Sequence, residues 1–267
     1  MVLAPAQGSA RKKELHLWSL PRGEVARDRL AAEGEALLSP AERRRLEAIS
    51  HDGRARSFCL GRALLREALA CQLDCAPQDL VFGEGENGKP FLIGEERNGL
   101  DFSLSHGAGE LLVAVAETEG LGVDLEAVTR AQQVLEIAKR LFAPEERRLL
   151  EEAGEKAAPL ALLLWTLKEA VTKSLGQTIW QAVGQVVLGV KGSEIAWLCR
   201  QPRGGPESWT LLSGNFRGSH RFALALWHPQ QPSGTWQLRC HRAGDGDGAS
   251  EAYDITASAG GWEHKAD

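Results

Sequence analysis

Two short segments of the chain carry residue types suited to metal-dependent chemistry on a phosphate. Residues 122–126 read GVDLE, and as a strand they would point Asp124 and Glu126 to one face. Residues 165–173 read WTLKEAVTK, a helical pattern in which Glu169 and Lys173 stand one turn apart on the same face. If strand and helix pack together, three carboxylates converge beside an ammonium. Such oxygen ligands suit Mg²⁺, so the pattern predicts a metal-dependent site for a phosphate ester or diphosphate.

Each segment also has an ordinary interpretation. Glu169 and Lys173 could form a surface ion pair, which contributes only a few tenths of a kcal/mol. Asp124 and Glu126 could lie on the solvated face of an edge strand. The other motifs in the chain favour the chemical interpretation over these two.

Taken in order, the motifs resemble those of the 4′-phosphopantetheinyl transferases of the large, single-chain type. The two segments match that family's G-[IV]-D-x-E strand and its W-x-x-K-E-x-x-x-K helix. Upstream, Gly88–Pro90 and Phe102–His106 resemble its G-K-P and F-N-[IL]-S-H segments, and Arg54–Arg62 resembles its arginine-rich G-R helix. The likeness runs from Leu15 to about Trp227. No single motif is specific, but the ordered set is.

The sequence departs from the family pattern at two positions. Ser103 stands where Asn is common, a small polar exchange that leaves Ser105 and His106 intact. Ala143 stands where many members have Ser or Thr. A hydroxyl there would cap a helix, and its loss should weaken the cap by about 1 kcal/mol.

The resemblance implies a reaction in which the phosphopantetheine arm of coenzyme A moves to a serine of an apo acyl or peptidyl carrier protein. Adenosine 3′,5′-bisphosphate would be released. Asp124 and Glu126 would ligate Mg²⁺, with Glu169 a third ligand, a base for the attacking serine, or both. Lys173 would stabilise the diphosphate and the leaving group as a point charge. The predicted catalytic residues are therefore Asp124, Glu169 and Lys173.

Coenzyme A also carries a 3′-phosphate and an adenine. The resemblance makes Ser105 and His106 candidates for holding the 3′-phosphate, with Lys89 and Arg56 as further cations. The ordinary alternative for His106 is a turn histidine that is bonded to the backbone. For Arg56 the alternative is a charge on a helix surface.

Two other classes of function remain open from the sequence. One is a Mg²⁺-dependent phosphohydrolase that uses the same carboxylates and a water nucleophile on coenzyme A-like diphosphates. The other is a non-catalytic module that binds coenzyme A or a carrier protein. The sequence has no G-x-S-x-G elbow, P-loop or H-E-x-x-H motif to suggest a different chemistry.

Composition is that of an ordinary soluble protein. The 267 residues are 43% hydrophobic and 25% charged, and the net charge of −5 argues against a nucleic-acid-binding surface. The five cysteines form an odd count without C-x-x-C spacing, which favours a reducing compartment. Residues 1–13 lack the apolar part of a signal peptide, and no stretch is long enough to span a membrane. We expect a cytoplasmic monomer.

The elements predict an α/β (α+β) fold. A strand is expected at 15–20, and apolar strands are expected at 111–116 and 222–226. Ser39, Pro40 and Glu42 form a capping-box pattern, so one helix should begin at Pro40. A second helix should span about 53–73.

The second half of the chain echoes the first. The segments LSPAERR at 38–44 and FAPEERR at 142–148 have the same residue pattern and lie 104 residues apart. The helix and strand patterns that follow also correspond, which suggests two similar lobes. The resemblance likewise implies a pseudo-two-fold axis with the site in the cleft between the lobes. We expect an N-terminal lobe at 1–119, a C-terminal lobe at 120–239 and a disordered tail at 240–267.

Overall fold

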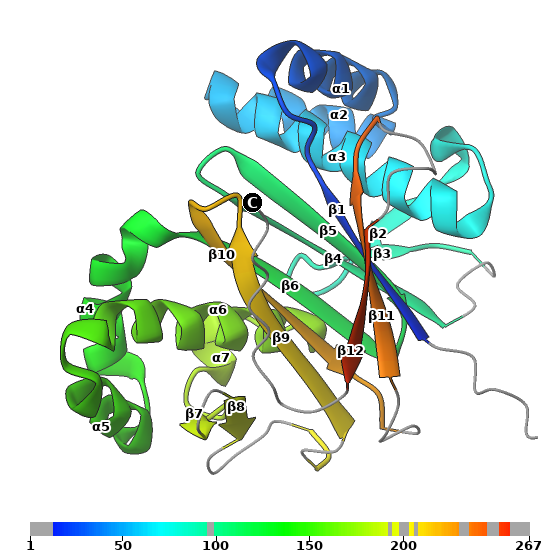
Figure 1. Ribbon diagram of the computed structural model, residues 1–267. Coiled ribbons are helices and arrows are strands. Elements are labelled where there is room, and N and C mark those ends of the chain that lie inside the picture. The colour runs from blue at the N-terminus through cyan, green and yellow to red at the C-terminus, as the bar shows by residue number, and fades with distance from the viewer. Residues whose placement is uncertain are drawn as a thin grey trace, which may run out of the picture.

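The computed structural model is a mixed α/β structure and describes residues 13–94, 99–191, 194–197, 203–205, 208–229, 235–244 and 251–256. A five-stranded sheet has the order β12-β11-β1-β5-β4, and a three-stranded sheet has the order β6-β10-β9. Two short pairs, β2-β3 and β7-β8, complete the described strands. Figure 1 shows α1, α2 and α3 over the five-stranded sheet, and α4, α5 and α6 beside the three-stranded sheet.

The elements have the following bounds. The helices are α1 (Glu24–Ala36), α2 (Pro40–Glu47), α3 (Asp52–Leu73), α4 (Ala131–Leu141), α5 (Pro144–Ala153), α6 (Ala157–Ser174) and α7 (Ile179–Ala182). The strands are β1 (Lys13–Ser19), β2 (Phe82–Glu84), β3 (Pro90–Leu92), β4 (Leu100–Gly107), β5 (Glu110–Glu117), β6 (Gly120–Ala127), β7 (Leu188–Lys191), β8 (Glu194–Trp197), β9 (Trp209–Phe216), β10 (His220–Trp227), β11 (Thr235–Arg242) and β12 (Glu251–Thr256).

The core is layered as helices, sheet, sheet and helices. Along β5, Val113 and Val115 pack toward α3, whereas Leu112 and Ala114 pack toward the three-stranded sheet. This alternation follows from the two-residue period of a strand. Both faces of β5 are thus buried, which explains why its sequence is a continuous apolar run. On the far side, α6 covers the outer face of β9 and β10.

Side chains rather than a backbone ladder join the two sheets. Three alternate residues of β4 turn oxygen atoms toward β6 and accept hydrogen bonds from its amides. Asp101 Oδ2 accepts from Leu121 N at 2.7 Å. Ser103 Oγ and Ser105 Oγ accept from Val123 N and Leu125 N, each at 3.1 Å. These three bonds satisfy amides that would otherwise be unpaired at the edge of β6.

A buried ion pair anchors the helices on each side of the molecule. In the N-terminal half, Glu42 of α2 bonds the Ser39 amide and pairs with Arg66 of α3 at 3.0 Å. The Arg66 guanidinium also donates to two carbonyls of the segment after α3, at Pro77 and Leu80. Arg66 thereby fixes α2 and the chain that follows α3.

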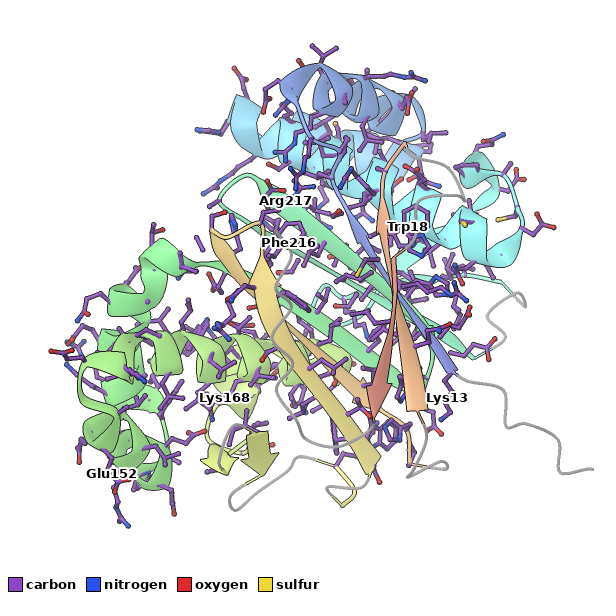
Figure 2. All side chains as sticks on the ribbon, viewed as in Figure 1. Lys13, Trp18, Glu152, Lys168, Phe216 and Arg217 are labelled. Atoms are coloured by element: carbon purple, nitrogen blue, oxygen red, sulfur yellow. The ribbon has the colours of Figure 1, made fainter. Side chains whose placement is uncertain are left out.

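The C-terminal half contains a matching arrangement. Glu146 of α5 bonds the Ala143 amide and pairs with Lys168 of α6 at 2.8 Å, both side chains being fully buried. Lys168 Nζ also donates to the carbonyls of Val183 and Val186. Figure 2 places Lys168 beneath α6. The hydrogen bond from the Ala143 amide to Glu146 is one of the two bonds of a capping box. The other bond would need a hydroxyl at position 143, which alanine lacks.

Most of the predicted elements are confirmed. The helix α2 begins at Pro40 behind a complete capping box from Ser39, and α3 spans Asp52–Leu73. The strands expected at 15–20, 111–116 and 222–226 are β1, β5 and β10 within a few residues. Among the described residues no helix has the length and hydropathy that crossing a bilayer requires.

The expectation of a disordered tail at 240–267 is wrong for two segments. Cys240–Arg242 complete β11, and Glu251–Thr256 form β12. The strand β11 runs parallel to β1, with Leu15 opposite Leu238. Buried Trp236 and Leu238 tie this strand into the core. Residues 245–250 and 257–267 lie outside the described part of the chain.

Candidate active site

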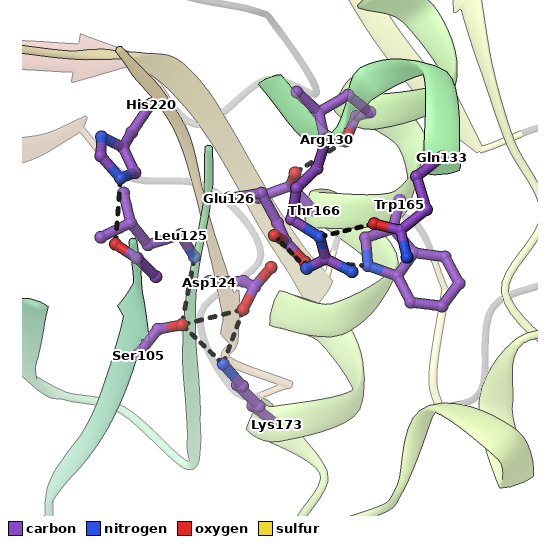
Figure 3. Close-up of polar contacts among 12 residues, drawn as sticks. Ser105, Asp124, Leu125, Glu126, Arg130, Gln133, Trp165, Thr166, Lys173 and His220 are labelled. Atoms are coloured by element: carbon purple, nitrogen blue, oxygen red, sulfur yellow. Dashed lines mark hydrogen bonds and ion pairs between the residues drawn. The ribbon is translucent and has the colours of Figure 1, made fainter. Parts of the chain in front are cut away.

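Strand β6 and helix α6 bring Asp124 and Lys173 into direct contact. Asp124 Oδ1 accepts from Lys173 Nζ at 2.7 Å and from Ser105 Oγ at 2.9 Å. Lys173 Nζ also donates to Ser105 Oγ at 2.9 Å, which closes a triangle of polar contacts (Figure 3). The Asp124 carboxylate is buried, whereas the Lys173 side chain is 30% exposed. The ammonium therefore neutralises the carboxylate and still reaches solvent.

A second carboxylate of β6 is held by a different cation. Both oxygens of Glu126 accept from Arg130 Nη1, at 2.7 and 2.5 Å. Trp165 Nε1 of α6 donates to the same carboxylate at 3.3 Å. The pKa of Glu126 is raised, because burial and the nearby Asp124 charge outweigh the effect of Arg130. Figure 3 shows this group beside the Asp124 triangle.

Glu169 is partly buried on the same side of α6. Its carboxylate makes no hydrogen bond or ion pair with the residues that the structure describes. Burial, with the charges of Asp124 and Glu126, raises the pKa of Glu169 to about 7, against a smaller opposing effect of Lys173 and Arg130. Negative charge is thus concentrated where the sequence predicted three carboxylates and one ammonium.

Gly122 allows α6 to approach β6 closely enough to form this site. A Cβ atom at Gly122 would lie 1.8 Å from the carbonyl oxygen of Ala170 and 2.7 Å from the amide of Ser174. No side chain fits there, so the glycine of the GVDLE segment fixes the distance between the strand and the helix. That distance sets how Asp124 meets Lys173.

One oxygen of the site lacks a partner in the described part of the molecule. Asp124 Oδ2 is buried without a hydrogen bond, although burying such an atom unpaired is costly. The described His, Cys, Asp and Glu residues include no group of three already placed to hold a metal ion. Asp124 Oδ2 and the Glu169 carboxylate are therefore oxygen donors without a partner among the described residues, whereas Glu126 is engaged by Arg130.

The predicted coenzyme A residues lie in different surroundings. The His106 side chain reaches solvent beside the site, and its pKa is lowered by desolvation from the surrounding protein and by the Lys173 ammonium. No described backbone group bonds its ring, so the turn-histidine alternative finds no support there. Lys89 Nζ donates to Asp101 Oδ2 at 2.8 Å and to the Leu121 carbonyl at 3.0 Å. Lys89 thus extends the contacts between β4 and β6.

Arg56 lies on the surface where α3 contacts α1. Its guanidinium pairs with Asp28 at 2.7 Å and with Glu24 at 2.8 Å. This is the position that the ordinary alternative, a helix-surface charge, describes. A role for Arg56 toward coenzyme A stays a prediction.

A cleft of about 1200 Å³ adjoins the site. Its lining includes Lys89 and Asp101 on one side and Ser174 and Gly176, directly after Lys173, on the other. It takes in the beginning of β4, whereas Ser105 lies near the end of that strand. The cleft is bordered by the five-stranded sheet, by β3 and by the end of α6, and a cleft of this size is a favoured place for a ligand.

Sequence reasoning missed Arg130 and the role of Trp165. Arg130 stands four residues after Glu126, a spacing at which opposite charges meet once the chain coils after the strand. That spacing was the available signal. In the sequence, Trp165 stood out only as part of a motif. Its indole N–H reaches Glu126 because α6 crosses β6.

Comparison with known proteins places these features in a family. The sequence model of the 4′-phosphopantetheinyl transferase superfamily matches residues 120–227. A protein of Synechocystis sp., provisionally named a 4′-phosphopantetheinyl transferase, is 39% identical over 180 residues, covering 67% of this chain and 72% of the relative. The 4′-phosphopantetheinyl transferase HetI of Nostoc sp. is 31% identical over 202 residues, covering 74% of this chain and 81% of HetI.

A third relative extends the same pattern. The 4′-phosphopantetheinyl transferase of Bacillus subtilis is 28% identical over 159 residues, covering 57% of this chain and 69% of the relative. The matched region of the superfamily contains both β6 and α6, which carry Asp124, Glu126, Glu169 and Lys173. The chain therefore belongs to the 4′-phosphopantetheinyl transferase superfamily.

Proposed function

We propose that the residues around Asp124 and Lys173 form the active site of this transferase. The chain moves the 4′-phosphopantetheine group of coenzyme A to a serine of an apo carrier protein. The serine oxygen forms a bond to the phosphorus that bears pantetheine. The bond from that phosphorus to the bridging oxygen breaks, and adenosine 3′,5′-bisphosphate leaves with the electron pair.

The observation that carries this assignment is the contact of Asp124 with Lys173 and Ser105 at the junction of the two sheets. Lys173 is positioned as a cation for the diphosphate, since its ammonium is partly exposed while it holds Asp124. Charge grows on the leaving phosphate as the bond breaks. A fixed ammonium stabilises that charge without reorganisation.

The donor set suits Mg²⁺. Asp124 offers a buried oxygen without a partner among the described residues. The charge of Asp124 raises the pKa of Glu126, and the charges of Asp124 and Glu126 raise the pKa of Glu169. Asp124, Glu126 and Glu169 would hold the ion. When bound, Mg²⁺ would offset the charge of the diphosphate. Arg130 would release Glu126 as the ion binds.

The serine proton must pass to a base. Glu169 is the carboxylate of the site with no partner among the described residues, so it is the candidate acceptor, directly or through water. His106, exposed beside Lys173, is the candidate contact for the 3′-phosphate. Lys89 supports the adjoining cleft, where the remainder of coenzyme A would extend.

The architecture supports an origin from two similar lobes. Glu42 with Arg66 and Glu146 with Lys168 occupy equivalent places, each joining a helix start to the next helix and to the segment after it. Each half then continues into an antiparallel hairpin, β4-β5 and β9-β10. We take residues 1–119 and 120–239 as the two lobes, apart from β11, and expect the protein to be a cytoplasmic monomer.

Mass measurement of a carrier protein tests the proposal. The protein is incubated with Mg²⁺, coenzyme A and an apo carrier protein, and the carrier should gain one phosphopantetheine. Asp124→Ala should abolish the gain while the circular dichroism spectrum is retained. Hydrolysis of coenzyme A without a mass gain would favour a phosphohydrolase. Binding without either reaction would favour a non-catalytic module, and a normal rate in Asp124→Ala would remove Asp124 from the site.

A further inference from the structure

The Ser105 hydroxyl has used its entire hydrogen-bonding capacity inside the protein. A serine hydroxyl offers one proton and two lone pairs. Ser105 Oγ donates to Asp124 Oδ1 at 2.9 Å. It accepts from Lys173 Nζ at 2.9 Å and from Leu125 N at 3.1 Å. An ionised phosphate oxygen is only an acceptor, so it would have to take the proton that Asp124 now receives.

This hydroxyl is also buried and rigidly placed. Ser105 is 4% exposed, and the amide of Leu125 fixes its oxygen from the neighbouring strand. Ser105 is the third member of the row in which Asp101 and Ser103 also accept amides of β6. It differs from Ser103 in one respect, which is its contact with the Asp124 carboxylate and the Lys173 ammonium.

The two oxygens of Asp124 consequently have different roles. Ser105 and Lys173 both bind Oδ1, whereas Oδ2 is buried and has no partner among the described residues. When hydrogen bonds hold one oxygen of a carboxylate in place, the carboxylate group cannot rotate freely. The position of its second oxygen is then fixed as well. Partners of this kind set the orientation and the affinity of metal-ligating carboxylates.

We propose that Ser105 is a positioning residue, which fixes the Asp124 carboxylate so that Oδ2 faces the metal ion and keeps Lys173 beside it. This rests on the proposed function of Asp124 as a metal ligand. It assigns Ser105 to Asp124 rather than to the 3′-phosphate of coenzyme A. The row of contacts that joins the sheets thus extends directly into the active site.

Direct binding of Mn²⁺ in the absence of coenzyme A provides the test. Isothermal titration would compare the wild type with Ser105→Ala, Ser105→Thr and Ser103→Ala. Ser105→Ala should weaken Mn²⁺ binding by about 10- to 100-fold, the usual effect of losing a partner of a metal ligand. Ser105→Thr retains the hydroxyl and should restore most of the affinity. Ser103→Ala removes an equivalent amide acceptor without touching Asp124, so its Mn²⁺ affinity should match the wild type.

A second measurement separates positioning from phosphate binding. The ratio of the affinities for coenzyme A and dephospho-coenzyme A should be unchanged in Ser105→Ala. If Ser105→Ala binds Mn²⁺ normally but discriminates less between coenzyme A and dephospho-coenzyme A, the proposal is overturned. Ser105 would then be assigned to binding the 3′-phosphate. Equal loss of Mn²⁺ binding in Ser103→Ala would also overturn it, because the effect would then be one of sheet pairing.

Two controls keep the outcome decisive. If Ser105→Ala does not fold, Ser105→Cys provides the same comparison, since it keeps the volume and donates a weaker hydrogen bond. If the wild type neither binds Mn²⁺ nor modifies a carrier, the proposed function itself fails. Wild-type binding and transfer with unchanged Mn²⁺ affinity in the Ser105 variants would refute only the positioning role.

Discussion

Glu169 and Arg130 are the two residues of the site whose roles can be tested most directly by substitution. Glu169 has no bonded partner among the described residues, although four charged neighbours shift its pKa. Arg130 binds a carboxylate that the proposed metal ion also requires. Substitution of Glu169 therefore tests its role in the reaction, and substitution of Arg130 tests its contact with Glu126.

Replacing Glu169 with Gln distinguishes a base from a metal ligand. The amide keeps the size and one acceptor oxygen but cannot take a proton. If Glu169 is the base, the transfer rate should fall by about 10²–10⁴-fold while coenzyme A binding persists. If it is chiefly a ligand, the Mg²⁺ concentration for half-maximal rate should rise instead. Rates measured against Mg²⁺ decide between them, and a normal profile would remove Glu169 from the site.

Replacing Arg130 with Gln should make the site bind Mg²⁺ more readily. The guanidinium neutralises Glu126 from a side chain that is 42% exposed, and partly solvated pairs contribute about 0.2–1 kcal/mol. Its removal should lower the Mg²⁺ concentration for half-maximal rate by up to about fivefold. Arg140→Gln, at an exposed position of α4, is the control. A higher Mg²⁺ requirement would mean that Arg130 supports the site instead of competing for Glu126.

The contact between β6 and α6 determines the geometry of the site at the scale of elements. Asp124 and Glu126 come from the strand, whereas Trp165, Glu169 and Lys173 come from the helix. Neither element holds the site alone. The close approach at Gly122 keeps them in register.

Gly122→Ala should disturb this contact without altering any polar group. The new Cβ would meet the Ala170 carbonyl, so α6 must shift away from β6. We expect a loss of about 1–3 kcal/mol in unfolding free energy, typical of overpacking, together with a reduced transfer rate. Gly184→Ala, which introduces a Cβ into open space, should leave both unchanged. Urea unfolding and carrier modification measure the two effects, and wild-type values for Gly122→Ala would contradict this packing role.

Local elements were predictable because their signals lie within a few residues. The Ser39–Glu42 capping box located the start of α2, and the apolar run at 111–116 located β5. Asp124 and Lys173 were also paired correctly, since each lies in a segment with a clear period. Arg130 was overlooked because its bond to Glu126 depends on a turn after β6 that has no strong periodic signal.

Long-range pairing was not predictable in the same way. The sequence of β11 contains nothing that specifies β1 as its partner, which lies more than two hundred residues away. Small and polar residues near the end of the chain suggested disorder because they lack a core of their own. The buried partners of Trp236 and Leu238 come from elsewhere in the molecule.

At the scale of the whole molecule, a histidine contact connects the first strand, β1, with β11 near the other end of the described chain. His16 Nδ1 of β1 lies 2.9 Å from His241 Nε2 of β11 and 3.1 Å from Gln72 Nε2 of α3. Glu14 faces the other ring nitrogen at 3.4 Å. Burial, opposed by Glu14 and reinforced by Arg239, lowers the pKa of His16. The folded protein therefore favours the neutral ring.

This linkage gives stability a defined dependence on pH. As the pH falls, His16 takes up a proton near pH 6.5 in the unfolded chain and only at a lower pH in the folded protein. The free energy of unfolding should therefore fall as the pH drops below 6.5. The loss should level off once the pH passes below the folded pKa. Urea unfolding at pH 7.5 and pH 5.5 should show a smaller difference for His16→Gln than for the wild type. Equal differences would exclude His16 as a source, and His51→Gln, at an exposed position, is the control.

The placement of β1 between β5 and β11 imposes an order on the events of synthesis. The ribosome completes β1 and β5 early, but β11 is made only when residues 235–242 are added. Until then one edge of β1 exposes unpaired amides and carbonyls, which are open to pairing with other chains. A nascent or prematurely terminated chain should thus be far more prone to aggregate than the finished protein, and chaperone capture during translation should end only as the final strands emerge.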